Sequence, residues 1–342
     1  MSKTDIKSML PQELKDYFEA AGERQFRADQ AFSWLHSGAA SFQDMTNLPE
    51  ALREKLDEEF YIAVPVLLKK QESKEDGSIK YLWEMPGGAA IESVVMEYAH
   101  GYTACISTQA GCKMGCRFCA SAIGGFQRNL SSSEMEDQVL FSGRDCGKKI
   151  SNIVLMGVGE PLDNFDNVIR FLEIIRHPSG MNIGARHISL STCGIAENID
   201  KMADHNIQLT LSVSLHAPDD ETRSLLMPVN RPGGVDELLK ACERYFRKTH
   251  RRVSYEYAMI SGINDTGRHA VLLKKKLKNS GCHVNIIVLN EIPGSPYKAS
   301  SPESVKAFAE TLRRGGVNCT VRRRLGGDIE ASCGQLRSRA LQ

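Results

Sequence analysis

Apolar residues recur along most of the chain in two alternating patterns, short runs typical of buried strands and longer stretches with helical spacing. The strand-like runs are Ile91–Glu97, Thr103–Ser107, Asn152–Met156, His187–Ser191, Gln208–Ser214, Val253–Met259, Val284–Leu289 and Thr320–Arg323. Between them, helical spacing occurs at Ser133–Phe141, Asn167–Arg176, Ile195–Ala203, Val235–Arg247, Arg268–Asn279 and Ser304–Arg314. This alternation predicts an α/β fold in which helices connect the strands of a parallel sheet. It fits a doubly wound sheet and a barrel equally well.

The N-terminal part has a different pattern. Gln12–Ala21 and Arg27–Ser37 carry apolar residues at helical spacing, and Glu50–Phe60 resembles a third helix entered through a proline. A polar turn then precedes a strand at Ile79–Met85. We therefore expect a small, mainly helical accessory domain over residues 1–88 and an α/β domain over residues 89–342.

Composition is that of a water-soluble protein. Hydrophobic residues make up 42% of the 342 residues and charged residues 25%. No apolar run approaches the roughly 18–20 residues of a membrane span, and the N-terminus lacks the apolar segment of a signal peptide. Ten cysteines in such a chain favour reduced thiols and a cytoplasmic location.

Positive charge is concentrated near the C-terminus. The whole chain carries a formal charge of +1, but residues 268–342 hold 14 Lys/Arg against 5 Asp/Glu, a local charge of +9. Such a segment can form a phosphate-binding face. For the lysines at 274–276 a solvated helix surface explains the charge better, whereas Arg322–Arg324 leads directly into a cysteine-containing loop.

The strongest chemical signal is a glycine-rich turn with three cysteines. Cys112, Cys116 and Cys119 have C-x3-C-x2-C spacing, and Phe118 precedes the last of them. Three thiolates in one loop can hold three irons of a 4Fe–4S cluster and leave the fourth iron open to a small molecule. A zinc site would require a fourth ligand, and buried structural cysteines are the second alternative. The glycines and charges of this loop favour the cluster.

Polar residues follow several of the predicted strands. In a barrel the loops at the carboxyl ends of the strands line the site, although a plain strand–helix turn or a structural histidine would explain each residue singly. The candidates in this series are Gly159, Glu160, Ser191, Ser214, Leu215, His216 and Asn290.

A second cysteine motif lies near the C-terminus, where Cys333 is flanked by glycines in a segment rich in cations. The glycines predict a mobile loop, and the cations favour thiolate chemistry. On local sequence alone an incidental surface cysteine explains it at least as well.

Together these motifs resemble a known family. The three-cysteine loop is similar to that of radical S-adenosylmethionine (SAM) enzymes. With Gly159-Glu160-Pro161, Ser214-Leu215-His216-Ala217-Pro218 and the segment from Asp328 to Leu336, the chain resembles, over nearly its whole length, the RlmN family of rRNA/tRNA adenine methyltransferases and the related Cfr methylases. The resemblance implies a partial (β/α)6 barrel, open on one side to admit a macromolecule.

The resemblance also implies residue roles. Cys112, Cys116 and Cys119 would bind the 4Fe–4S cluster, and the series from Gly159 to Asn290 would contact SAM. Cys333 would take a methyl group from one SAM, and a radical made from a second SAM would activate that methyl for addition to adenine. Cys105 would resolve the protein–RNA adduct through a transient disulfide with Cys333. Glu92 would accept a proton.

The same resemblance implies partners and leaves alternatives open. We expect methylation of carbon-2 of an adenosine in the peptidyl transferase centre of 23S rRNA and of the anticodon-adjacent adenosine of tRNA. We also expect a monomer, an electron donor such as flavodoxin and no membrane association. The alternatives are a Cfr-like carbon-8 methylase and a non-catalytic RNA-binding protein with a structural metal.

The chain departs from the family at Leu325-Gly326-Gly327-Asp328, where some members have Arg-Gly-Asp-Asp. This difference leaves the RNA contacts of that loop open. Cys146, Cys193, Cys242, Cys282 and Cys319 receive no role.

Overall fold

The predicted alternation of strands and helices forms one continuous sheet in the computed structural model, which describes residues 3–230 and 233–337. Within that part of the chain the sheet has ten strands in the order β14-β13-β12-β11-β10-β9-β6-β5-β4-β3. The parallel strands are β6 (Gly101–Cys105), β9 (Ile150–Leu155), β10 (Ile188–Thr192), β11 (Thr210–Ser214), β12 (Ser254–Met259), β13 (His283–Val288) and β14 (Asn318–Val321).

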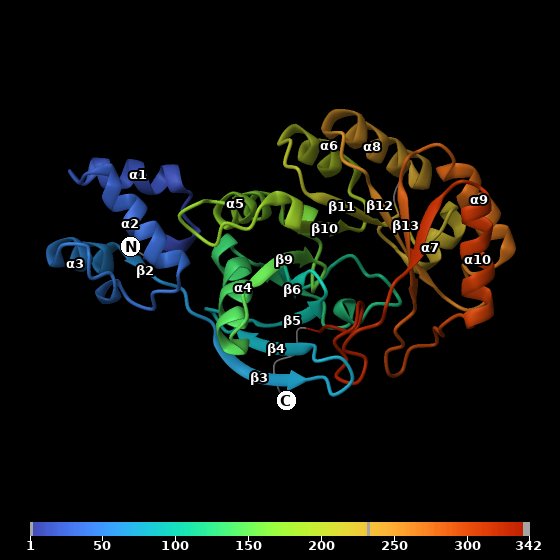
Figure 1. Cartoon of the computed structure of the whole chain (residues 1–342), viewed down its shortest axis with the longest axis horizontal. Coiled ribbons are helices and arrows are strands. Elements are labelled where there is room, and N and C mark those ends of the chain that lie inside the picture. Colours follow the sequence, from blue (N-terminus) through green and yellow to red (C-terminus); the bar gives the residue numbers. More distant parts are fainter. Residues whose placement is uncertain (1–2, 231–232, 338–342) are drawn as a thin grey trace.

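The sheet curves without closing, so β14 and β3 form opposite edges. Figure 1 shows the helices following the outside of this arc and the C-terminal segment crossing its inside. The outer helices are α4 (Ser132–Cys146), α5 (Phe165–Ile175), α6 (Ala196–Asp204), α8 (Gly234–Thr249), α9 (Gly267–Leu277) and α10 (Pro302–Arg314). The short helix α7 (Asp220–Leu226) follows the carboxyl end of β11. The predicted α/β fold, an open partial barrel, is confirmed.

The antiparallel part of the sheet comprises β3 (Val66–Glu72), β4 (Ile79–Glu84) and β5 (Ala90–Tyr98). Trp83 of β4 pairs with Ile91 of β5, and Val94 of β5 pairs with Cys105 of β6. The sheet therefore continues across the predicted domain division after residue 88. That division stays a prediction.

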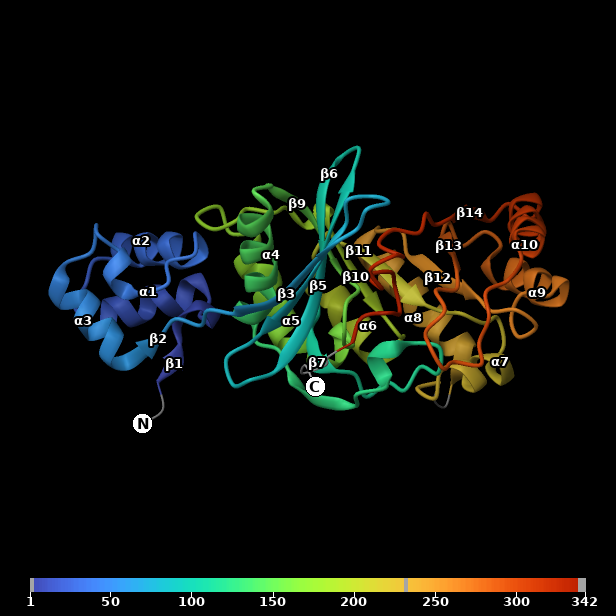
Figure 2. The ribbon, with the colours of Figure 1, turned by 90° about the horizontal axis from the view of Figure 1, so that it is seen from below.

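The N-terminal helices pack around a core of their own. This helical unit contains α1 (Pro11–Ala20), α2 (Gln25–His36), α3 (Glu50–Glu59) and the strand pair β1 (Thr4–Asp5) and β2 (Phe60–Tyr61). Phe18, Leu35 and Leu56 are fully buried in it, and Ile174 of α5 completes the core from the barrel side. Figure 2 shows the helical unit at one end of an elongated molecule.

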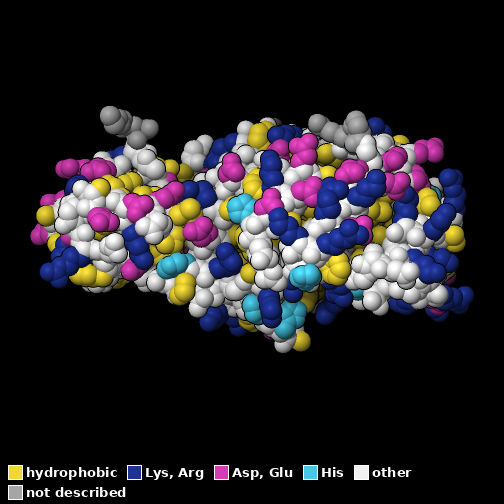
Figure 3. All heavy atoms as spheres, turned by 90° about the horizontal axis from the view of Figure 1, so that it is seen from above, with side chains coloured by type: hydrophobic (Ala, Val, Ile, Leu, Met, Phe, Trp, Pro, Cys, Tyr) yellow, Lys and Arg dark blue, Asp and Glu magenta, His cyan; other side chains and the backbone are white. Residues whose placement is uncertain are grey.

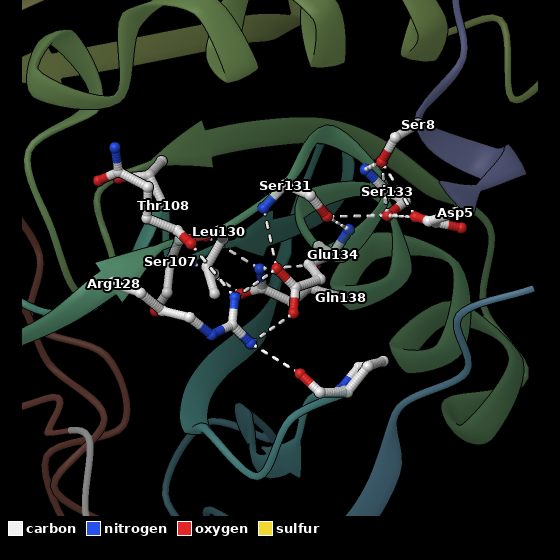
Figure 4. Close-up of polar contacts among 12 residues, drawn as sticks. Asp5, Ser8, Ser107, Thr108, Arg128, Leu130, Ser131, Ser133, Glu134 and Gln138 are labelled. Atoms are coloured by element: carbon white, nitrogen blue, oxygen red, sulfur yellow. Dashed lines mark hydrogen bonds and ion pairs between the residues drawn. The ribbon is translucent and has the colours of Figure 1, made fainter. Parts of the chain in front are cut away.

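Buried polar contacts join the helical unit to helix α4. Lys7 forms an ion pair with Asp137, and His36 Nδ1 lies 2.6 Å from Glu136 Oε2, with all four side chains buried. Figure 4 shows the adjoining network, in which Ser8 Oγ lies 3.0 Å from Ser133 Oγ.

None of the described helices is long and apolar enough to cross a membrane.

Candidate active site

The three cysteines of the glycine-rich turn line a cavity at the carboxyl ends of the parallel strands. We call it the cluster cavity. Its walls bring together most of the predicted site residues: Cys112, Cys116, Cys119, Gly159, Glu160, Ser191, Ser214, His216, Asn290 and Cys333. Leu215, Cys105 and Glu92 do not line it. The motifs predicted from separate strand ends therefore meet in space.

A small hairpin presents the cysteines, and the strand pattern did not predict it. Strand β7 (Gln109–Gly111) pairs with β8 (Phe126–Asn129), and the three-residue helix η3 (Ala120–Ala122) follows Cys119 directly. Gly111 closes the hairpin with φ of +76°, and an added Cβ would lie 1.7 Å from the carbonyl oxygen of Gly125. Only glycine fits there, because the conformation is left-handed and the backbones touch.

The environment of the thiols suits a bound iron–sulfur cluster. Burial raises the pKa of Cys112 to about 11 and also raises the pKa of Cys116 and Cys119. Without a metal these thiols hold their protons at neutral pH, since a thiolate requires a cation nearby. Among the described residues no three His, Cys, Asp or Glu side chains converge on one ion. A four-iron cluster fits this arrangement better than zinc, because each thiolate binds a different iron.

Glu160 is held rigidly beside the cluster cavity. Its Oε2 accepts the Cys193 N–H at 2.6 Å, and its Oε1 accepts the Leu162 N–H at 3.0 Å. Burial raises the pKa of this carboxyl, and those N–H donors oppose the rise. Gly159 precedes it with φ of +113°, where an added Cβ would lie 2.7 Å from the Cβ of Gln109. The turn can thus approach a ligand closely.

His216 presents a neutral imidazole to the same cavity. Its Nδ1 accepts the Ala258 N–H at 2.9 Å, so the ring proton resides on Nε2. Burial lowers its pKa to about 3, and the charge of Arg223 contributes. The residue has φ of +56°, and its ring meets Phe118 edge-on at 4.9 Å.

Ser191 is the last residue but one of β10 and Ser214 ends β11, and both line the cavity. Leu215 is fully buried and donates its backbone N–H to Glu256 O at 3.1 Å, so its side chain belongs to the core. Asn290 follows β13, and its Nδ2 donates to the carbonyl of Cys333 at 3.0 Å. The side chain of Asn290 thus touches the cysteine-containing loop from the cavity wall.

Cys333 belongs to two cavities at once. A second one, about 350 Å³ in volume and here called the thiol cavity, contains Cys105 and Cys333 together with Arg322–Arg324. Met156, Asn290, Arg322 and Cys333 line both cavities. Burial raises the pKa of Cys105 to about 12, and the negative charge of Cys333 adds to the increase. The two predicted reactive thiols are therefore electrostatic neighbours.

Residues 325–337, the cysteine loop, are docked against the barrel rather than projecting from it. The Ala120 N–H donates to Gly334 O at 2.7 Å, and Ser121 Oγ donates to Leu336 O at 2.8 Å. At the start of the loop, Asp76 Oδ2 accepts the Gly326 N–H at 2.7 Å. The sequence predicted a mobile loop from its glycines. These contacts attach the loop to the helical turn that follows Cys119 and to the β3–β4 turn, and its mobility stays a prediction.

Glu92 lies beside the C-terminal end of the cysteine loop and lines neither cavity. Its Oε2 accepts the Arg337 N–H at 2.6 Å, and its Oε1 lies 3.5 Å from Lys80 Nζ. Burial raises the pKa of the Glu92 carboxyl, although Arg337 and Lys80 oppose the rise. A raised pKa suits a proton acceptor, but in this conformation the carboxylate holds the loop.

Two charged residues of the site were missed by sequence reasoning. Glu256 and Arg322 both line the cluster cavity, 3.9 Å apart. The pKa of Arg322 is raised by the negative charge of Cys333 and then by that of Glu256. Glu256 was detectable as a lone charge in an otherwise apolar strand. Arg322 belonged to the basic run Arg322–Arg324, which was noted because it leads into the cysteine loop, and only the sheet register places it in the cluster cavity.

The outer helical face carries charge of both signs. Figure 3 shows acidic and basic side chains intermingled above the outer helices. Arg244 lies 2.8 Å from Asp200, and Arg247 lies 2.6 Å from Glu243. Lys276 pairs with Asp236, as expected for a solvated helix surface. The cations at Arg322–Arg324 lie instead on the thiol cavity.

A cluster-binding loop at the mouth of an open α/β barrel defines a radical SAM enzyme. Residues 106–273 match the model of the radical SAM superfamily, and residues 4–62 match that of the ribosomal RNA large subunit methyltransferase N-terminal domain. A radical SAM methyltransferase from Sphaerobacter thermophilus has a similar structure, with a TM-score of 0.92, 39% identity, and coverage of 98% of this chain and 100% of that one.

The sequence relatives are more specific. A probable dual-specificity RNA methyltransferase RlmN from Alkaliphilus oremlandii is 48% identical over 342 residues, which cover 100% of both chains. A protein of the same name from Clostridium tetani is 47% identical over 328 residues, or 96% of this chain and 94% of the relative. The chain belongs to the RlmN family of radical SAM methyltransferases. Its cofactors are the 4Fe–4S cluster and SAM, as predicted.

Proposed function

We propose that this protein methylates carbon-2 of an adenosine in 23S rRNA and in tRNA through a methyl group carried on Cys333. The observation that carries the proposal is the position of Cys333, which lines both the cluster cavity and the thiol cavity with Cys105. One thiol can thus face the cofactor on one side and a base on the other. The family's "dual-specificity" name supports two classes of RNA substrate.

The chemistry explains why a carrier thiol is needed. Carbon-2 of adenine is electron-poor, so it does not attack the methyl group of SAM as a nucleophile would. The bound cluster and SAM supply a 5′-deoxyadenosyl radical. Cys112, Cys116 and Cys119 hold that cluster, while Glu160, His216 and Asn290 line the adjoining space in which SAM would bind.

The chain's own thiols handle the methyl group. Cys333 Sγ would attack the methyl carbon of one SAM and release S-adenosylhomocysteine, with Arg322 as a neighbour in both cavities. The 5′-deoxyadenosyl radical would remove one hydrogen atom from the methyl on Cys333, and the resulting carbon radical would bond to the base. Cys105 Sγ would then bond to Cys333 Sγ as the carbon–sulfur bond breaks, with one electron returned to the oxidised cluster and one proton added to the carbon to complete the methyl group. The disulfide that remains must be reduced by a thiol reductant. Glu92 accepts the proton lost from the base once its contact with Arg337 opens.

Access of the base follows from the same geometry. A target adenosine must leave its stack to reach a buried thiol, and Arg323 and Arg324 on the thiol cavity offer cations for the flanking phosphates. A cytoplasmic location, a monomeric state and a flavodoxin-like electron donor remain predictions.

Regiochemistry is tested by digesting RNA that the reconstituted enzyme has modified. Mass spectrometry of the nucleosides is expected to detect 2-methyladenosine from 23S rRNA and tRNA. The Cys333→Ala variant is expected to yield less than about a thousandth of that amount, as for other lost nucleophiles. A product containing 8-methyladenosine and no 2-methyladenosine would support the Cfr-like alternative. Zinc instead of an iron–sulfur chromophore would support the non-catalytic one.

A further inference from the structure

Arg223 is a buried cation that the mechanism above does not use. It lies on α7, only 3% exposed. Its Nε donates to Leu215 O at 3.2 Å, and its Nη2 donates to Cys193 O at 2.5 Å and Ser214 O at 3.3 Å. Its Nη1 donates to Asn230 Oδ1 at 2.7 Å. All four acceptors are uncharged, and the carboxylate of Asp220 is linked to the guanidinium through Asn230, whose Nδ2 donates to Asp220 Oδ1 at 3.0 Å.

The acceptors lie at the ends of two strands. Ser214 ends β11, and Cys193 directly follows the end of β10. Both residues line the cluster cavity, and Arg223 holds their carbonyls from behind. One side chain thus fixes two neighbouring strand ends of the cavity wall.

The cluster-binding loop packs directly on α7. The Arg117 N–H donates to Leu226 O, the last residue of α7, at 3.0 Å. Cys116 packs against the apolar cluster that includes Cys193 and Leu226. Burial lowers the pKa of Arg223, and negative charge on Cys193, Cys116 or Asp220 would oppose that lowering. The guanidinium therefore lies within electrostatic range of a cluster ligand.

A buried cation is stabilised by anions nearby. A 4Fe–4S cluster with three thiolates is anionic, and reduction adds one further negative charge. A fixed cation in a low-dielectric site stabilises the reduced form more than the oxidised one, because net charge is among the factors that set cluster potentials.

We propose that Arg223 is a positioning residue whose fixed charge behind Cys116 raises the reduction potential of the 4Fe–4S cluster, while its hydrogen bonds hold the SAM-binding ends of β10 and β11. The proposal rests on the family's cofactors and not on the carbon-2 chemistry proposed above. A wrong regiochemistry would leave it intact.

Redox titration followed by electron paramagnetic resonance tests the proposal on anaerobically reconstituted protein without RNA. Arg223→Met removes the charge at similar volume, and Arg223→Lys keeps the charge but loses the planar fork of donors. Arg251→Met is the matched control, because Arg251 binds Leu209 O at 3.3 Å and Thr210 Oγ1 at 3.4 Å, at the opposite end of β11. Iron and sulfide content, measured in parallel, restrict the comparison to loaded protein.

The expected result is a midpoint potential that is lower in Arg223→Met, close to the parent in Arg223→Lys and unchanged in Arg251→Met. An unchanged potential in loaded Arg223→Met would overturn the proposal, as would an equal shift in Arg251→Met. If Arg223→Met does not hold the cluster, Arg223→Gln removes the same charge and keeps two donors. An unchanged potential in that variant would be equally decisive.

Discussion

Hydrogen bonds that involve the backbone set the positions of the functional side chains at this site. Cys333 reaches both cavities because two hydrogen bonds fix the backbone beside it. Asn290 donates to the carbonyl of Cys333, and the Ala120 N–H donates to the carbonyl of Gly334. His216 turns its Nε2 away from the sheet because Ala258 occupies Nδ1. The position of the Cys333 thiol and the orientation of the His216 imidazole thus depend on backbone contacts that cannot be predicted from a single motif.

Replacing Cys105 by alanine removes the thiol that resolves the adduct. The Cys105→Ala variant is expected to accumulate a covalent protein–RNA species, visible as a nuclease-sensitive band of higher mass on a denaturing gel. Cys319→Ala is the control, because Cys319 is also buried in a strand and its Sγ donates to Ala309 O at 3.4 Å. Normal turnover by Cys105→Ala would contradict its role.

The pH dependence of stability contains a term from His216. Its pKa is about 3 in the folded protein against 6.5 for an ordinary histidine, so the unfolded chain binds the proton first as pH falls. The contribution of His216 to the free energy of unfolding is therefore present above pH 6.5. It is lost as the pH falls below that value, by about 2 kcal/mol between pH 7 and pH 5.

His216→Asn tests this term, because asparagine tolerates the left-handed backbone and can accept the Ala258 N–H. In urea denaturation of the cluster-free protein, the variant is expected to lose about 2 kcal/mol less than the parent between those pH values. Equal losses in the two proteins would show that His216 titrates normally.

At the scale of elements, the site is made by two loops that dock on each other. Helix η3 after the cluster cysteines donates to the cysteine loop, and the β3–β4 turn holds the start of that loop through Asp76. The sequence predicted the long strands and helices well, because their apolar spacing is regular. It missed the β7–β8 hairpin and α7, which are too short to show a period and are stabilised by contacts with distant segments.

The Asp76→Ala variant tests the docking of the cysteine loop. Loss of its hydrogen bond to Gly326 is expected to reduce methylation about tenfold, since a loosened Cys333 occupies the productive position less often. Cluster content and SAM affinity should stay unchanged. The exposed neighbour Glu75 provides the control Glu75→Ala. Equal activities in the two variants would argue that docking does not limit turnover.

At the scale of the whole molecule, the sequence predicted an open barrel with a helical accessory unit, and the structure has both. Polar candidates at successive strand ends could be predicted because parallel strands end at one edge of a sheet. The approach of Arg322 to Glu256 could not be predicted, because the two side chains meet through the register of β12 to β14, which no local pattern encodes. The contacts between the helical unit and α4 could not be predicted either, because the partners are 130 and 100 residues apart in the sequence.

The buried ion pair between Lys7 and Asp137 is expected to couple the two parts. Lys7→Met leaves Asp137 buried without its partner, which should cost about 3–5 kcal/mol of unfolding free energy in urea. Lys7→Met combined with Asp137→Leu should recover most of that loss. Lys15→Met breaks the half-exposed pair with Asp29 and should cost less than about 1 kcal/mol. A similar cost for Lys7→Met and Lys15→Met would mean that the buried pair does not secure the helical unit.

The central claim is that the transferred methyl group passes through Cys333, and peptide mass spectrometry tests it most directly. The reconstituted enzyme is incubated with SAM carrying a labelled methyl group in the absence of RNA, and its peptides are then analysed. The account predicts label on Cys333 and on no other cysteine, and transfer of that label to adenosine when RNA and reductant are added. Methylated RNA formed by protein that never carries label on Cys333 would contradict the account.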